Sequence, residues 1–170
     1  AVLARVGTFG KAVGAHGAFI ACSAATRELL VNTGRTYIFT TGLPPAAAGA
    51  ALAGIEVVSS ERGDELRATL QARASQLRSG LLALGFEVVG DADAPIVPVL
   101  VGDPILCKQV TDELMDQYKV YVQPINYPTV ARGTERLRIT PTPMHTDAMM
   151  DDLVAALVDI WRDLSLNRAT

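Results

Sequence analysis

A single lysine in a glycine-rich segment near the start of the chain is the residue best suited to chemistry. Lys11 follows Gly7-Thr8-Phe9-Gly10 and precedes a run of small residues, Ala12-Val13-Gly14-Ala15-His16-Gly17-Ala18. A lysine amine that is partly unprotonated forms a Schiff base with a carbonyl cofactor. Small residues on both sides let a bulky, flat cofactor approach the backbone closely. The segment is therefore suited to a lysine that carries a cofactor.

Two other interpretations compete for this lysine. A phosphate-binding P-loop requires a glycine five positions before the Gly-Lys pair and a serine or threonine after the lysine. Arg5 and Ala12 occupy those two positions, so a P-loop is excluded. The other interpretation is an ordinary surface lysine in a glycine-rich turn, and the short motif alone does not separate it from a cofactor lysine. Motifs further along the chain are needed to decide.

The composition describes a globular protein and excludes several classes of partner. The chain has 170 residues, of which 49% are hydrophobic, and a net charge of −3 without a basic block. We therefore expect no nucleic-acid partner, and no apolar run is long enough to predict a membrane span. Cys22 and Cys107 form no disulfide framework, and neither they nor His16 and His145 form a metal-ligand pattern. Buried free thiols in a reducing compartment and no bound metal are expected.

The hydrophobic pattern predicts strands and helices that alternate along the chain, without an internal repeat. Helices are predicted after Ser23 to about residue 31, from Pro45 to about 59, over 66–84, from Pro104 to about 118, and after Thr146 to about 164. Extended segments are predicted at 18–22, 37–41, 86–89, 96–101, 120–123 and 136–140, the first of them as a buried strand. Gly85 ends the long helix, and 126–133 is a loop with proline and glycine.

This order of elements predicts an α/β fold made of two parts. Residues 1–45 cannot bury their apolar strands alone, because a pair of strands is only marginally stable without a larger sheet. We therefore expect them to be the C-terminal edge of another, larger domain. Residues 46–170 are predicted to form a long linking helix and a small C-terminal α/β domain with a short, mostly antiparallel sheet. A chemically active lysine so close to the start also leads us to expect that an N-terminal part of the protein is missing.

Three motifs, in the order in which they occur, give the chain a family resemblance. They are the lysine segment 7–11, the segment 39–45 with two threonines before Gly-Leu-Pro-Pro, and the segment 121–141 with its Pro-Thr-Val-Ala-Arg-Gly loop. Together they resemble the α-oxoamine synthases, pyridoxal 5'-phosphate (PLP) enzymes that join an amino acid to an acyl-CoA, and most of all the 5-aminolevulinate synthases. The resemblance covers the whole chain but less than half of the family's length. It implies the C-terminal part of a fold-type I PLP-dependent transferase, with 1–45 at the edge of the large PLP-binding domain.

The resemblance implies a cofactor role for four residues. Lys11 matches the lysine that is linked to PLP and later moves the α-proton of glycine, and Thr8 matches a hydroxyl near the cofactor phosphate. Thr40 and Thr41 match a hydroxyl pair that binds the phosphate of the neighbouring subunit's cofactor, so a homodimer with shared active sites is implied. Hydroxyl and backbone N–H groups satisfy the acceptor-rich phosphate. Without the resemblance, both threonines could be ordinary β-branched residues of a strand.

Two residues have substrate roles by the same resemblance. Arg138 matches the arginine that holds the substrate carboxylate, and Thr129 matches the threonine that contacts the succinyl carboxylate. The planar fork of arginine fits a carboxylate in a way that lysine cannot reproduce. Arg132 and Arg136 lie close in the sequence and remain rivals for an anion-binding role.

These roles imply an acyltransferase that condenses glycine with succinyl-CoA to give 5-aminolevulinate, CoA and CO2. This reaction is the first step of tetrapyrrole and haem biosynthesis, placed in the cytoplasm or, in a eukaryote, in the mitochondrial matrix. The acid that pairs with the pyridine nitrogen of PLP and the group that stacks on its ring lie upstream of the lysine in the family. We therefore expect the 170 residues alone to be inactive.

Two alternatives remain open. The first is an 8-amino-7-oxononanoate synthase of the biotin pathway, which uses alanine and a pimeloyl thioester. The neighbourhood of Gly17 and residues 34–36 look closer to these enzymes, although 123–127 argues against them. Ala131 also departs from the pattern, because the family usually has a proline there, and the change adds freedom to the loop. The second alternative is a non-catalytic subunit that only completes a partner's site, which would have no use for Lys11.

Overall fold

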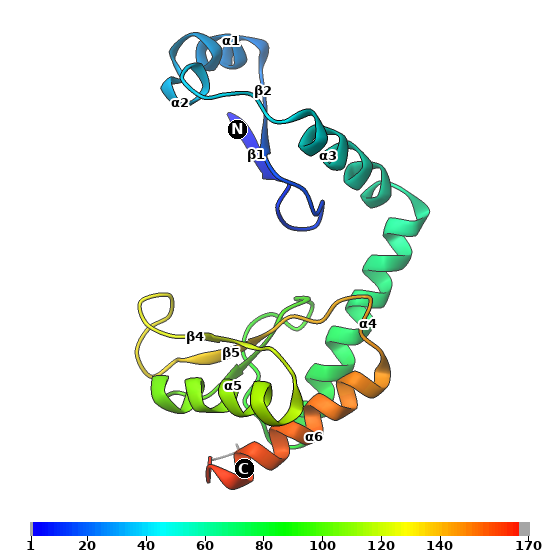
Figure 1. Ribbon diagram of the computed structural model, residues 1–170, viewed down its shortest axis with the longest axis vertical. Helices are drawn as coiled ribbons and strands as arrows, with labels where there is room; N and C mark the ends of the chain where they lie inside the picture. Colours follow the sequence, from blue (N-terminus) through cyan, green and yellow to red (C-terminus); the bar gives the residue numbers. More distant parts are fainter. Residues whose placement is uncertain (1, 167–170) are drawn as a thin grey trace. The chain divides into compact units, whose positions relative to one another are not determined.

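The computed structural model describes residues 2–166 of the chain (Figure 1). The chain divides into two compact units, Ala1–Glu65 and Leu66–Thr170. Helix α4 (Glu61–Ala83) begins in the first unit and contributes most of its length to the second. The predicted division into domains at residue 45 stays a prediction.

The first unit begins with a hairpin of two antiparallel strands, β1 (Ala4–Thr8) and β2 (Ala18–Cys22). Thr8 pairs with Ala18, so the lysine segment connects the strands. The strand predicted at 18–22 is confirmed, but the prediction that it is buried is wrong. Phe19 and Ile20 are 49% and 52% exposed, because no element of the described residues covers this two-stranded sheet.

Three helices complete the first unit. The first, α1 (Ala24–Thr33), begins after Ser23, whose hydroxyl oxygen accepts the Thr26 N–H as predicted for an N-cap, and ends at Gly34. It is followed by the single turn α2 (Arg35–Ile38) and by α3 (Pro45–Val58), which has its proline in the first turn.

The extended segment predicted at 37–41 is wrong in its first half. Tyr37 and Ile38 lie in α2, and their N–H groups both donate to the Gly34 carbonyl oxygen at 2.9 Å. Residues 39–41 pair with no strand. β-Branched and aromatic residues form a strand only where a partner strand receives their hydrogen bonds, and local turn bonds are formed here instead.

The second unit packs helices on one face of a three-stranded antiparallel sheet (Figure 1). The strands are β3 (Val97–Leu100), β4 (Gln123–Ile125) and β5 (Arg136–Ile139), in the spatial order β3-β5-β4. Helices α5 (Pro104–Tyr118) and α6 (Asp147–Asp163) contact each other, and α6 also runs beside α4. This arrangement confirms the predicted α/β class and its short antiparallel sheet.

Local signals set the helix boundaries of the second unit where the sequence predicts them. Asp103 caps α5 by accepting the N–H groups of Ile105 and Leu106, and Thr146 caps α6 by accepting that of Met149. Gly85, with φ of +79°, follows the end of α4, and the Phe86 N–H returns to the Leu81 carbonyl oxygen at 3.0 Å.

Two predicted strands of the second unit differ from the structure. The segment 86–89 contributes only an isolated bridge between Val88 and Val99. The segment predicted at 120–123 forms its strand later, at Gln123–Ile125, because Gln123 is the residue that pairs with Arg138 of β5. Whether and where these segments form strands depends on their register with a neighbouring strand. A single stretch of sequence does not contain that information.

The hydrophobic core lies in the second unit. It includes buried side chains of Ala74, Leu77, Leu81, Phe86, Val97, Val99, Cys107, Val110, Leu114, Val122, Leu137, Ile139, Met150, Leu153, Ala156, Leu157, Ile160 and Trp161. Phe86 and Trp161 pack edge to face with ring centroids 5.0 Å apart. Along β5 the side chains alternate, so that Leu137 and Ile139 are buried while Arg138 is exposed. Within the described residues no helix is long and apolar enough to span a membrane.

Candidate cofactor and substrate site

The lysine segment forms a compact turn at the end of the hairpin. The Phe9 N–H donates to the Gly17 carbonyl oxygen at 2.9 Å, and the Ala15 N–H donates to the Phe9 carbonyl oxygen at 2.8 Å. Inside this ring the Gly14 N–H closes a turn on the Lys11 carbonyl oxygen at 2.9 Å, and Gly14 has φ of +67°. Lys11 therefore lies on a turn whose backbone is fixed by its own hydrogen bonds.

Close contacts at three glycines hold this turn in place within the first unit. A Cβ at Gly7 would overlap the Phe19 ring, and a Cβ at Gly54 of α3 would overlap the Val13 carbonyl oxygen. A Cβ at Gly17, where φ is +112°, would lie 2.9 Å from both methyl groups of Leu43. The absence of side chains at these positions is what allows β2, α3 and the segment after Thr41 to approach the turn.

The predicted cofactor residues of the first unit present their side chains to the surface. Lys11, Thr8, Thr40 and Thr41 are all exposed, and none of the described residues makes a side-chain hydrogen bond or ion pair with them. Nothing lies within 4 Å of the space that a side chain would take at Gly14 or at Gly42. Exposed side chains beside open backbone leave room for a cofactor, and the role of these four residues in holding it stays a prediction.

The predicted substrate residues belong to the second unit. Thr129 lies in loop 126–133, where its N–H donates to the Asn126 carbonyl oxygen at 3.0 Å and its side chain is exposed. Across the loop the Arg132 guanidinium stacks on the Tyr127 ring, 4.5 Å from its centroid. The Tyr127-Pro128 peptide bond is cis. The loop is thus an ordered turn that presents the Thr129 hydroxyl outward.

The surroundings of the three neighbouring arginines differ. The Arg136 Nε donates to the Thr134 carbonyl oxygen at 2.8 Å, and Arg132 is engaged with Tyr127. Arg138 lies at the centre of the sheet, between Gln123 and Pro98, and no described residue makes a hydrogen bond or ion pair with its side chain. Of the three, Arg138 has the guanidinium most available for an external carboxylate, although its substrate role stays a prediction.

Of two buried groups near loop 126–133, the Cys107 thiol was predicted from the sequence and the Glu135 carboxyl group was not. Cys22, also predicted to be buried, is only half-buried. The Glu135 side chain is 2% exposed, and Cys107 of α5 is fully buried. Burial raises the pKa of the Cys107 thiol to about 11, and the nearby charges of Glu135 and Asp103 raise it too, while a hydrogen bond with the Ile125 backbone acts in the opposite direction. The thiol therefore stays protonated near neutral pH and is not a nucleophile.

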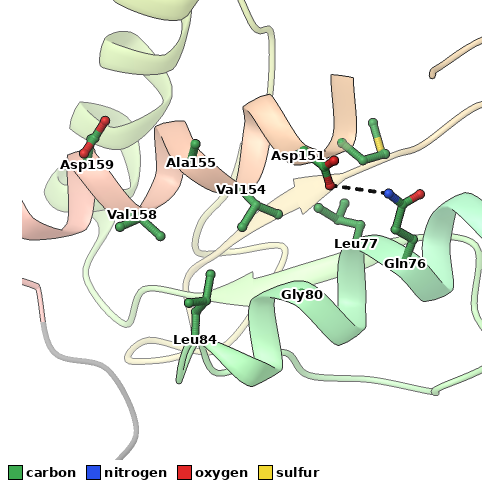
Figure 2. A pocket seen from close by; sticks show the side chains of 10 residues that line it. Gln76, Leu77, Gly80, Leu84, Asp151, Val154, Ala155, Val158 and Asp159 are labelled. Atoms are coloured by element: carbon green, nitrogen blue, oxygen red, sulfur yellow. Dashed lines mark hydrogen bonds between the residues drawn. The ribbon is translucent and has the colours of Figure 1, made fainter. Parts of the chain in front are cut away.

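A separate cavity lies between α4 and α6 (Figure 2). Its walls are mostly apolar, with Leu77, Gly80 and Val154 facing each other across the two helices, and the Gln76 Nε2 donates to the Asp151 Oδ1 at 3.4 Å on its rim. None of the predicted site residues lines it. The cavity is a gap in helix packing that shares nothing with the predicted cofactor and substrate residues.

Comparisons with known proteins give the chain a consistent set of relatives. The sequence model of the family described as aminotransferase class I and II matches residues 2–157. A 5-aminolevulinate synthase of Paracoccus denitrificans is 44% identical over 164 residues, which are 96% of this chain and 40% of that protein. A 5-aminolevulinate synthase of Rhizobium meliloti is 47% identical over 163 residues, which are again 96% of this chain and 40% of that protein. The chain thus spans about 40% of the length of these relatives.

Solved structures agree with the sequence relatives. A serine palmitoyltransferase that carries PLP has a TM-score of 0.88 and 29% identity, over 98% of this chain and 41% of that one. The 8-amino-7-oxononanoate synthase of Francisella tularensis has a TM-score of 0.79 and 28% identity, over 96% of this chain and 46% of that one. The predicted fold, that of the C-terminal part of a fold-type I PLP-dependent enzyme, is confirmed, and the family implies PLP as the cofactor.

Proposed function

The chain belongs to the aminotransferase class I and II family, and from that premise we propose that it is the C-terminal part of a 5-aminolevulinate synthase. In this proposal the whole protein condenses glycine with succinyl-CoA and releases 5-aminolevulinate, CoA and CO2, the first step of haem and tetrapyrrole synthesis. The observation that supports it most is the identity of 42% to 47% with relatives of that name along nearly the whole chain. The solved neighbours share the fold at 27% to 29% identity.

Lys11, Thr8, Thr40 and Thr41 would hold the cofactor. The exposed amine of Lys11 suits a covalent link to the cofactor carbonyl, and the threonine hydroxyls suit its phosphate. PLP, when bound, supplies an electron sink for the negative charge that develops at the substrate α-carbon. Thr40 and Thr41 would serve the cofactor of a second copy of the chain, which makes the active protein a homodimer.

The remaining residues would bind and orient the two substrates. Arg138 would hold the glycine carboxylate in its planar fork, so that a Cα proton faces the Lys11 Nζ, which accepts it. Thr129 would donate its hydroxyl hydrogen to the terminal carboxylate of succinyl-CoA. The glycine α-carbon then bonds to the thioester carbon and the CoA thiolate leaves. The former glycine carboxyl group departs as CO2, and the α-carbon takes up a proton in its place. Loop 126–133 would exclude water while this occurs.

The test compares the full-length wild-type protein with a variant in which Lys11 is replaced. The wild type is expected to form 5-aminolevulinate from glycine and succinyl-CoA, and borohydride reduction is expected to fix PLP on Lys11, as read by peptide mass spectrometry. Lys11→Ala should lose both the adduct and the turnover. Lys108→Ala, which removes an exposed lysine that pairs with Asp112 on α5, is the matched control and should keep both.

Two results would contradict the proposal in different ways. A Lys11→Ala protein that keeps the reducible adduct would show that another lysine carries the cofactor. A wild type that prefers alanine and a pimeloyl thioester would move the protein to the 8-amino-7-oxononanoate synthases.

A further inference from the structure

Glu135 is a buried acid for which the proposed reaction has no use. Its side chain is 2% exposed, and no lysine, arginine or histidine among the described residues makes an ion pair with it. Burying a carboxyl group without a cation is costly, so its position requires a compensating hydrogen bond. The residue lies two positions after the end of the loop that contains Thr129 and precedes Arg138 by three positions.

The compensating hydrogen bond reaches back into the loop. The Gly133 N–H donates to the Glu135 Oε2 at 2.8 Å, and Gly133 has φ of +79°. One residue later, the N–H and the hydroxyl of Thr134 both donate to the Ala131 carbonyl oxygen, at 3.1 and 2.7 Å. The carboxyl group therefore fixes the end of the loop at the residue where the backbone turns left-handed.

The main chain of Glu135 ties the same point to the segment between β3 and α5. Its carbonyl oxygen accepts the N–H groups of Val101 and Gly102, both at 2.9 Å. The start of the loop is tied to that segment too, because the Asn126 Nδ2 donates to the Pro104 carbonyl oxygen at 3.4 Å. Both ends of loop 126–133 are thus fastened to residues 101–104.

We propose that Glu135 is a positioning residue that sets the conformation of loop 126–133 and, through it, the place of the Thr129 hydroxyl in the acyl-substrate site. The assignment of that site rests on the proposed function, whereas the effect on the loop does not. Glu135 acts through the Gly133 N–H and does not touch the substrate.

The test separates the reach of the side chain from its charge. In the full-length protein, Glu135→Gln keeps an acceptor oxygen at the same reach, and Glu135→Asp keeps the charge but is one methylene too short to meet the Gly133 N–H. Glu87→Asp, the same change at an exposed glutamate of the second unit, is the control. Hydrogen exchange of a peptide spanning 126–134 in the substrate-free protein reports the loop, and steady-state kinetics report its consequence.

Glu135→Asp is expected to speed exchange of the loop peptide and to raise KM for succinyl-CoA about tenfold. KM for glycine and the yield of the PLP–Lys11 adduct should stay within about twofold of the wild type. Glu135→Gln and Glu87→Asp should match the wild type in exchange and in both KM values. Loop exchange that is unchanged in Glu135→Asp, or equal in the Asp and Gln variants, would overturn the proposal. Because exchange needs no turnover, a protein that makes no 5-aminolevulinate would contradict the proposed function and still test Glu135.

Discussion

Thr129 is the residue on which the choice of acyl substrate depends in our proposal. Its backbone is committed to the turn with Asn126, while its hydroxyl has no partner among the described residues. A site that reads a terminal carboxylate leaves its own polar groups unpaired when an alkyl thioester binds. The ratio of kcat/KM for succinyl-CoA to that for an alkyl thioester should then exceed the ratio that a difference of one methylene group produces.

Thr129→Val removes the hydroxyl at nearly constant volume. With succinyl-CoA we expect kcat/KM to fall by an amount equivalent to roughly 1–3 kcal/mol of transition-state binding, because a charge-assisted hydrogen bond is lost. With butyryl-CoA, which has no terminal carboxylate, the change should be small. Thr33→Val, at the exposed end of α1, is the matched control, because the Thr33 hydroxyl donates to the Leu29 carbonyl oxygen of its own helix. Equal losses with both thioesters would mean that Thr129 shapes the loop and does not read the substrate.

At the residue scale, a sequence motif can identify a candidate functional residue, but the sequence does not show which charged residues are buried. Lys11 stands out because glycines and small residues surround it. Glu135, in the string Thr-Glu-Arg-Leu-Arg, looks like one more charged residue at the start of a strand. Its burial, and the hydrogen bonds that Val101 and Gly102 make to its carbonyl oxygen, are seen only in the structure, because no local sequence pattern encodes these tertiary contacts.

At the scale of elements, helix ends follow from local chemistry, and strands do not. Ser23, Asp103 and Thr146 each cap a helix whose start was predicted, because a capping side chain and its N–H partner lie within three residues. The segments 37–41 and 120–123 were predicted from composition, and their state depends on a partner strand elsewhere in the chain. Local sequence signals therefore predicted the start of α5 correctly but misplaced β4.

Helix α3 offers a matched pair of glycines for a stability test. Gly54→Ala should destabilise the full-length protein by about 1–3 kcal/mol, because the added methyl group overlaps Val13 in the lysine turn. Gly49→Ala, which meets nothing within 4 Å, should stabilise it by about 0.5–1 kcal/mol through helix propensity. Denaturant unfolding measures both changes. If both glycines respond alike, α3 does not press on the lysine turn.

At the scale of the whole molecule, the two units differ in how they are held together. The hydrophobic core cluster lies in the second unit, and Ala51 is the buried hydrophobic residue that the described part of the first unit contributes. Large apolar side chains of the first unit, such as Phe39 at 79% exposed, remain uncovered by the described residues. The described residues thus leave much of the apolar surface of the first unit, which carries Lys11, exposed.

A mixing experiment tests the proposed sharing of sites between subunits. One full-length variant carries Lys11→Ala and the other carries Thr40→Ala with Thr41→Ala, and each alone should be nearly inactive. If the threonines serve the partner's cofactor, a mixed dimer has one intact site, and random mixing should restore about a quarter of wild-type activity. Mixing each variant with itself is the control. No recovery in verified mixed dimers would place all three residues in one subunit's site.

The hairpin that presents Lys11 should affect how the protein aggregates when it unfolds in part. Among the described residues, β1 and β2 pair only with each other, so each has an edge of unpaired backbone groups beside exposed Val6, Phe19 and Ile20. Such an edge is a template for strand addition from another molecule once heat or denaturant separates it from its neighbours. Precipitation of partly opened protein should therefore begin at this hairpin, ahead of any loss of the second unit's core. In our proposal, the segment that holds the cofactor is therefore also the segment at which aggregation is expected to begin.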